Sequence, residues 1–395
     1  MTAAETTHSL TDQGAIIACL RGIGESADPR APEIRAARRL PGDIVERLID
    51  SGVFRTWVPP CYGGLGGSAM DLFEAIEITS YFEASVGWVV MIGGTTALTS
   101  GFLSSEWAQK IYGNPRTMSG GFAAPAGRGV PVEGGLRVSG RWAWGSATTH
   151  CNWIVGGVSI SKDGDRQAVR PDGLTTPVVF FPSSEVTLHD NWHTLGLAGT
   201  GSVDYEVTDV LVPEGRWVPF PVSGPVIDEP LYNFTSIGAL ATGVAFVSVG
   251  IARRAIDELI SLAGAKVPAG AVRPLSERAL VQSQVIEAEA AWLSARAVLR
   301  EQVERCCEQA GVDGTISVEN RRLLRVAAIN ATERSARAVD IAYNAGGGSS
   351  IHDTSVLQRL FRDVHTATQH GANSPLFTER LGRMALGVTT HTGIV

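Results

Sequence analysis

The sequence lacks the features of a membrane, secreted or nucleic-acid-binding protein. No stretch approaches the ~18 uninterrupted apolar residues of a transmembrane helix, and Met1–Asp12 has neither the basic nor the apolar region of a signal peptide. The five cysteines contain no CxxC pair, which favours a reducing compartment and no structural zinc. A net charge of −7 argues against a nucleic-acid surface, which needs a basic patch. We therefore expect a cytoplasmic protein that binds neither membrane nor nucleic acid.

The common nucleotide-binding motifs are also missing. No GxGxxG follows an apolar strand, and no GxxxxGK[ST] occurs anywhere, so neither a Rossmann site nor a P-loop is predicted. Helical periodicity runs to about residue 115, and short apolar runs separated by turn residues follow to about residue 220. Helical periodicity then returns to about residue 384. Runs of one element type, in place of strand–helix alternation, predict the α+β class.

These changes of pattern suggest three domains in the 395 residues. We expect an N-terminal helical domain at 1–116, a central β domain at 117–222 and a C-terminal helical domain at 223–395. The periodicity predicts one helix over 70–88 and a strand over 178–181. Two further helical patterns, at 284–309 and 318–343, reach ~25 residues each and favour a bundle of long helices.

One segment suggests a ligand. In Gly140–Ser146 an aromatic side chain, Trp144, stands two residues before a hydroxyl, Ser146. An aromatic plane beside a small donor suits a flat heteroaromatic ring such as an isoalloxazine. The alternative is a pair of core tryptophans beside a turn serine, because aromatic residues are common in strands. Trp142, two residues earlier, is better explained as part of the core.

Five motifs carry a resemblance to a known family. In chain order they are Leu40-Pro41 through Tyr62-Gly63-Gly64, then Ala84–Trp88, Gly134–Trp142, Thr194–Ser202 and Leu357–Asp363. In this order and spacing they resemble the acyl-CoA dehydrogenase superfamily over nearly the whole chain. Within it, they are most similar to the flavin-dependent monooxygenases of two-component systems. The resemblance implies an N-terminal helical domain, a central β-barrel or sandwich domain and a C-terminal four-helix bundle.

The resemblance also implies a reaction. Reduced flavin, FADH2 or FMNH2, would arrive from a separate NAD(P)H-dependent flavin reductase and react with O2. Oxygen would add at C4a of the flavin, and the hydroperoxide would hydroxylate an aromatic or other electron-rich small molecule. The family's bundle contacts imply a homotetramer.

Three alternatives remain open. The first is an acyl-CoA dehydrogenase or oxidase. The glutamate base of those enzymes falls on Thr354 here, and a hydroxyl has no useful basicity near neutral pH. A base placed on another helix would restore that activity. The second alternative is a relative that oxidises nitrogen or sulfur, and the third is a non-catalytic scaffold.

The resemblance assigns flavin contacts to four residues. Trp144 matches the aromatic residue that packs on the flavin, and Ser146 matches the hydroxyl that bonds its N5 edge. Phe122 and Pro125 lie where the family has a flavin-contacting Thr-Glu-Pro segment. Because Ala123-Ala124 replaces Thr-Glu, only backbone contacts would remain at those two positions.

The catalytic candidates are two histidines late in the chain. In the related enzymes a histidine near His370 faces the flavin C4a, where it can deprotonate a phenol or stabilise the hydroperoxide. On one helix, His365 and His370 would lie ~140° apart, so both cannot face the flavin. We favour His370, with His365 at the surface or an interface. Their spacing does not suit a metal. Trp88 either lines the substrate pocket or packs in a helical core.

Three more residues are candidates for contacts with the flavin phosphates from a neighbouring subunit. Arg273 lies near the region from which relatives offer an arginine, but the usual RxxFG pattern is absent, so a free surface arginine is an equal alternative. Gly346 and Gly347 would let the backbone approach the phosphates, and they also end a helix.

Overall fold

The computed structural model describes residues 12–160, 176–220 and 224–390. The segment Met1–Asp12, in which no signal peptide is expected, lies outside these ranges except for Asp12. The carboxylate of Asp12 accepts a hydrogen bond from the Ala15 amide and so caps the first helix.

The N-terminal part is helical, as predicted. Its helices are α1 (Gln13–Ala27), α2 (Ala31–Ala37), α3 (Gly42–Asp50), α4 (Ala69–Phe82), α5 (Ala84–Ala97) and α6 (Ser105–Tyr112). Short 3-10 helices connect them: η1 (Asp28–Arg30), η2 (Val53–Arg55), η3 (Pro60–Tyr62) and η4 (Leu98–Gly101).

The prediction of one helix over 70–88 is wrong, because Glu83 separates α4 from α5 with an extended backbone (φ −145°, ψ 111°). The Glu83 carboxylate accepts a hydrogen bond from the Ser85 amide and caps α5. Its other oxygen accepts a bond of 2.8 Å from Arg359 on a later helix. A tertiary ion pair thus fixes a one-residue interruption that hydrophobic periodicity does not reveal.

The central part is a single seven-stranded sheet in the order β5-β6-β2-β1-β3-β4-β7. The strands are β1 (Ser119–Val132), β2 (Gly135–Trp142), β3 (Trp153–Ile160), β4 (Thr176–Pro182), β5 (Thr187–His189), β6 (Asp204–Pro213) and β7 (Trp217–Phe220), with η5 (Ser183–Glu185) between β4 and β5. The pair β1–β3 is parallel and the other neighbours are antiparallel. The strand predicted at 178–181 lies within β4.

The C-terminal part is the expected bundle. Its helices are α7 (Ser236–Ala265), α8 (Ala279–Asp313), α9 (Val318–Gly346), α10 (Val356–Ala367) and α11 (Pro375–Ala385), with the short helices η6 (Pro230–Asn233), η7 (Leu275–Glu277), η8 (Gly347–Ser349) and η9 (Gly371–Asn373). By length and composition α7 could cross a membrane, but 83% of its most apolar window is buried within the protein. It is the central helix of the bundle core.

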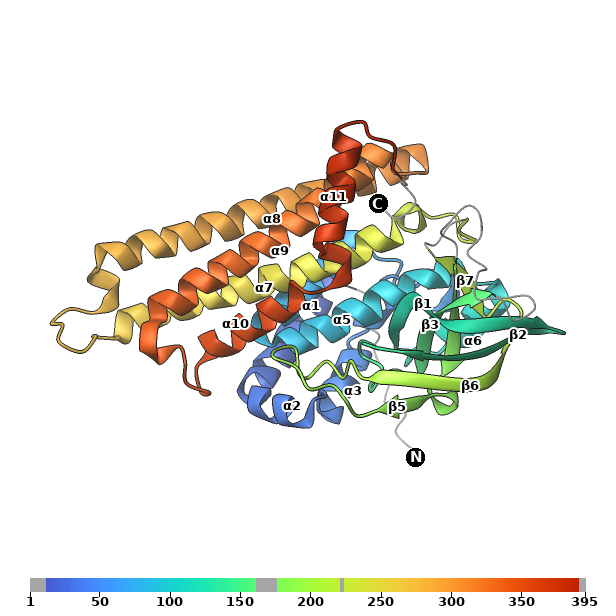
Figure 1. Ribbon diagram of the computed structural model, residues 1–395, viewed down its shortest axis with the longest axis horizontal. Coiled ribbons are helices and arrows are strands. Elements are labelled where there is room, and N and C mark those ends of the chain that lie inside the picture. Colours follow the sequence, from blue (N-terminus) through green and yellow to red (C-terminus); the bar gives the residue numbers. More distant parts are fainter. Residues whose placement is uncertain (1–11, 161–175, 221–223, 391–395) are drawn as a thin grey trace, which may run out of the picture.

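The three parts share one hydrophobic core. Helix α5 lies between the bundle and the sheet and packs against both α7 and β1 (Figure 1). Trp142 is fully buried in the sheet core, stacked on Tyr205 at 5.1 Å, and its indole N–H donates to the Gly157 carbonyl at 2.8 Å. Trp142 is therefore a core residue, as the sequence suggests. Because α5 is buried on all sides, its side chains can link the bundle to the sheet.

Candidate active site

Trp144 presents its ring to solvent on a constrained backbone. It follows β2 with a left-handed φ of 57°, and 63% of the residue is exposed. Its ring centroid lies 6.1 Å from that of Phe122, edge to face. A positive φ is uncommon for a bulky side chain and costs ~1–3 kcal/mol. Such strain, next to an exposed aromatic surface, is typical of a ligand site.

Phe122 and Pro125 bracket an irregularity in β1. The register with β3 shifts between Phe122 and Pro125, so Ala123 and Ala124 have no partner in this ladder. A Cβ at the opposing Gly157 would lie 2.1 Å from the Ala123 carbonyl oxygen, so only glycine fits there. The bulge exposes backbone at the place where the resemblance leaves only backbone contacts.

The hydroxyl of Ser146 is buried and already accepts two hydrogen bonds. Trp88 on α5 donates to it through its indole Nε1 at 3.3 Å, and Ser202 donates through its hydroxyl at 3.4 Å. A serine oxygen has two acceptor sites and one proton. The Ser146 proton is therefore left for another acceptor.

His370 lies against Trp88, with the ring centroids 5.5 Å apart. His370 and His365 do not share a helix, contrary to the expectation from the sequence, because α10 ends at Ala367 and His370 has an extended backbone (φ −66°, ψ 130°). Its Nδ1 accepts a hydrogen bond of 3.2 Å from the Ala372 amide and caps η9. Burial, and then the charge of Arg325, lower the pKa of His370 to about 4. At neutral pH the ring is uncharged, with its proton on Nε2.

His365 belongs to a different environment. Its Nε2 lies 2.8 Å from an Asp340 carboxylate oxygen on α9, and its ring packs 4.5 Å from that of Phe361. His365 and His370 therefore have different neighbours. The cause is that α10 ends before His370, and not the angle of ~140° that would separate the two side chains on one helix. Within the described ranges, no group of three His, Cys, Asp or Glu side chains could hold a metal ion.

Arg273, Gly346 and Gly347 lie far from Trp144 in the same chain. They belong to the α7–α8 and α9–α10 connections, at the end of the bundle opposite the sheet (Figure 1). The Arg273 side chain is 74% exposed and lies 3.6 Å from Glu277. Gly347 has a φ of 60°, and the Gly346 carbonyl accepts a bond of 2.7 Å from Lys266. One protomer does not bring these three residues to the other candidates.

Sequence reasoning missed the supports of the loop between β5 and β6. The Leu197 amide donates to the buried Asp363 carboxylate on α10 at 2.7 Å, and Leu197 has a left-handed φ of 51°. The Gly199 amide donates to the Ser85 hydroxyl on α5 at 3.2 Å. Ser202 then reaches Ser146. These supports lie in two motifs of the resemblance, Thr194–Ser202 and Leu357–Asp363. Only the fold shows that the two motifs are in contact.

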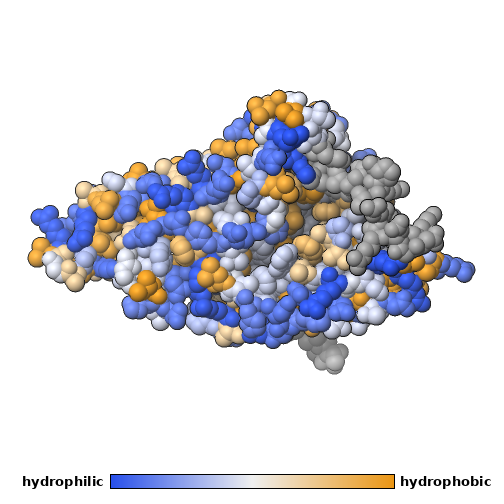
Figure 2. Space-filling view, in the orientation of Figure 1, coloured by the Kyte–Doolittle hydropathy of each residue, from blue (hydrophilic) through white to orange (hydrophobic). Residues whose placement is uncertain are grey.

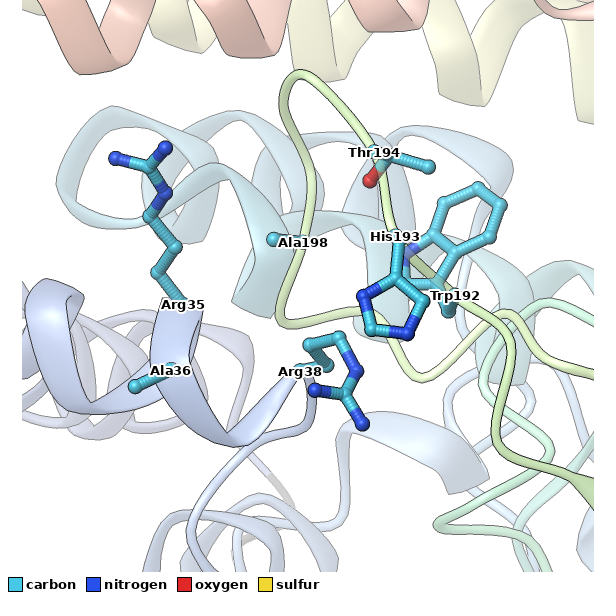
Figure 3. A pocket seen from close by; sticks show the side chains of 7 residues that line it. All are labelled: Arg35, Ala36, Arg38, Trp192, His193, Thr194 and Ala198. Carbon is cyan, nitrogen blue, oxygen red and sulfur yellow. The ribbon is translucent and has the colours of Figure 1, made fainter.

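A hollow of about 290 Å³ lies beside the same loop. Figure 3 shows Arg35 and Arg38 on one side of it, with His193 and Thr194 on the loop opposite. The remaining lining residues are Ala36, Trp192 and Ala198. None of the candidate site residues lines this hollow, and Arg38 is already paired with Asp190. It is separate from the cluster around Trp88.

The chain is similar to known proteins over nearly all of its length. The family model "Acyl-CoA dehydrogenase, N-terminal domain" matches residues 17–111, and "Acyl-CoA dehydrogenase, C-terminal domain" matches residues 242–375. The sequence is 31% identical to an indole-3-acetate monooxygenase of Pseudomonas putida, over 97% of this chain and 96% of the relative. It is 28% identical to the oxygenase component of an FADH(2)-dependent resorcinol hydroxylase of Rhizobium, over 94% of each chain.

The fold is also similar to that of a solved hydroxylase structure. The structure of 3-HSA hydroxylase from Rhodococcus superposes with a TM-score of 0.88 at 25% identity, over 96% of this chain and 99% of that one. The chain therefore belongs to the acyl-CoA dehydrogenase superfamily and, within it, to the flavin-dependent monooxygenases.

Proposed function

We propose that this protein is the oxygenase component of a two-component system that hydroxylates an aromatic or other electron-rich small molecule. The observation that carries the proposal is the chain of contacts from His370 through Trp88 to Ser146, beside the exposed ring of Trp144. A proton donor, a hydroxyl and an aromatic surface thus meet where α5 packs on the sheet. The Rhizobium relative, named as an FADH(2)-dependent oxygenase component, supports the choice of cofactor.

The residues present fit a flavin. Trp144 and Phe122 offer aromatic surface to a planar ring, the Ser146 proton is available to an acceptor on its edge, and the Phe122–Pro125 bulge offers backbone groups. Reduced flavin would supply the two electrons with which O2 is split, one oxygen atom entering the substrate and the other leaving as water.

His370 acts as a hydrogen-bond donor. Its Nδ1 is occupied by the Ala372 amide, so the ring offers Nε2–H to a ligand. Its lowered pKa makes it a weak base at neutral pH. Of the two roles that the resemblance allows, stabilising an oxygen atom suits this ring better than removing a phenol proton.

The assembly would be a homotetramer in the cytoplasm, served by a separate NAD(P)H-dependent flavin reductase. Leu280, Ile286 and Leu293 on α8 are each more than 60% exposed, which suits coverage by a second copy. Figure 2 shows a mostly hydrophilic face, with separate apolar groups over α8 and α11. In such an assembly, Arg273 and Gly346-Gly347 would reach the flavin phosphates of a neighbour.

The test starts with binding. Reduced FAD and reduced FMN are titrated anaerobically into the purified protein and followed by fluorescence, and a scaffold would show no saturable binding. Oxygen labelled with ¹⁸O is then admitted with a panel of phenols and indoles, and products are analysed by mass spectrometry. We expect one labelled atom per product molecule. A protein that binds FAD tightly and is bleached by an acyl-CoA, with no labelled product, would instead be a dehydrogenase.

A further inference from the structure

Arg325 on α9 is a fully buried arginine that no carboxylate neutralises within the described ranges. Its Nη1 donates to the Ile237 carbonyl at 3.2 Å, and its Nη2 donates to the Ala372 carbonyl. The guanidinium lies 4.3 Å from the ring centroid of Phe377. Burial lowers the pKa of Arg325 to about 10. A buried charge supported only by two carbonyls and one aromatic ring, with no carboxylate, is costly to keep in a protein core.

Arg325 and His370 both form a hydrogen bond with Ala372. Ala372 offers its carbonyl to the guanidinium and its amide to Nδ1 of His370, at 3.2 Å. The turn between α10 and α11 is therefore fixed from both sides of a single residue. Movement of the Arg325 guanidinium would therefore shift the Ala372 amide, which is the group that donates to His370.

We propose that Arg325 is a positioning residue for His370. It fixes Ala372 so that the amide occupies Nδ1, and this leaves Nε2 as the protonated nitrogen that faces a ligand. The inference rests on the proposed function only in taking His370 as the histidine of the reacting site.

The charge of Arg325 acts in the same direction. From α9, Arg325 is the charged group that opposes protonation of His370, in addition to burial. From α5, the ring faces the uncharged indole of Trp88. Arg325 therefore favours the neutral ring through its charge and selects one tautomer through its hydrogen bond.

A merely structural role is the alternative, because Arg325 also joins α9 to Ile237 and Phe377. The two roles differ in what they predict for the His370 ring. Substitution by methionine removes both the charge and the fork of donors. Substitution by lysine keeps the charge, but one ammonium group cannot bridge both carbonyls as a planar guanidinium does.

The experiment follows the histidine rings by NMR in flavin-free protein labelled at histidine with ¹³C and ¹⁵N. The His370 signals are assigned by their loss in His370→Gln. In the unsubstituted protein we expect one tautomer and no titration between pH 5 and 8. Arg325→Met should raise the pKa of His370 toward the ordinary value of ~6.5 and mix the tautomers. Arg322→Met is the control, because Arg322 lies on the same helix but pairs with Glu319.

If Arg325→Met fails to fold, as judged by thermal unfolding, Arg325→Lys decides. The lysine variant should keep His370 neutral but lose its single tautomer. A folded methionine variant, or a lysine variant, whose His370 signals match the unsubstituted protein overturns the proposal. With flavin and O2, both variants should divert at least about tenfold more oxygen to peroxide. Altered NMR signals with unchanged product yield would uphold the positioning role and reject the reacting role of His370.

Discussion

The indole N–H of Trp88 donates a hydrogen bond of 3.3 Å to the hydroxyl of Ser146. This bond joins the middle of α5 to the loop after β2, and the same indole meets His370 edge to face. Trp88 is 5% exposed, so it packs in a helical core as one alternative held, but its polar edge serves the site. Of the two explanations of Trp88 that the sequence leaves open, packing in a helical core is confirmed, and lining of the substrate pocket stays a prediction.

Trp88→Phe tests this bond. Phenylalanine keeps an aromatic ring against His370 but has no N–H, so one neutral hydrogen bond worth about 0.5–1.5 kcal/mol is lost. We expect a lower yield of hydroxylated product per flavin oxidised and a fall in flavin affinity of about three- to tenfold, because the Ser146 hydroxyl loses one of its two donors. Trp292→Phe is the control, because its indole donates to the Val249 carbonyl inside the bundle. An equal loss of coupling in both variants would show a general packing effect.

Ser202→Ala should change the hydrogen bonding of the Ser146 hydroxyl while residue 146 itself is not substituted. Ser202 fills one acceptor site of the Ser146 oxygen, and its loss frees the hydroxyl to turn. We expect flavin affinity to fall about three- to tenfold, the equivalent of one hydrogen bond, measured by fluorescence titration. Ser294→Ala, on α8, removes a hydroxyl bonded only to its own helix and should leave the affinity unchanged. Unchanged affinity in Ser202→Ala would exclude this support.

Asp363 makes the stability depend on pH. Burial, and then the negative charge of Glu83, raise the pKa of Asp363 above its ordinary value of 3.8, toward about 7. The folded protein then holds a proton that the unfolded chain releases between about pH 4 and 7. This contribution to stability is full below pH 4 and is lost as the pH rises through that window.

Asp363→Asn should remove this dependence, because an amide oxygen can still accept the Leu197 amide proton. The melting temperature of this variant, relative to that of the original protein, should increase as the pH rises from 4 to 7. Differential scanning fluorimetry measures both. Asp353→Asn is the control, since its side chain is 89% exposed. Parallel curves for Asp363→Asn and the original protein would contradict the raised pKa.

Much of the fold follows from the sequence, because long helices and buried strands have their own periodicity. The bundle helices and β4 occur where the pattern places them. The break at Glu83 does not follow, because an ion pair with Arg359 on a distant helix stabilises it. His370 lies beyond the end of α10, where its own side chain caps η9, and the pattern carries no signal for that.

The candidate site residues also fall into two groups: those that the sequence indicates and those that only the fold reveals. The resemblance indicated Trp144, Ser146 and His370, since each follows closely on a motif that resembles a known one. The contacts of Ser202 and Arg325 are non-local: Ser202 reaches across 56 residues to Ser146, and Arg325 across 47 to Ala372. No periodicity or spacing connects such pairs. Only the packing of α9 and of the loop before β6 brings them to the site.

Trp144→Gly separates stability from binding. Glycine adopts a positive φ without strain, so relief of the backbone at φ 57° should stabilise the protein by about 1 kcal/mol. The exposed indole contributes little to folding, so little packing is lost with it. Flavin affinity should nevertheless fall at least about fivefold, because one aromatic contact with the ring is worth ~1 kcal/mol or more.

The matched control is Asp209→Gly, which relieves a similar φ of 53° at an exposed position within β6, where its register with β2 shifts. That variant should keep its flavin affinity, although it also loses an exposed ion pair with Arg137 worth at most about 1 kcal/mol. Urea unfolding and anaerobic flavin titration measure the two quantities in both variants. If Trp144→Gly gains stability and still binds flavin with the original affinity, the strained backbone at Trp144 has no part in holding the cofactor.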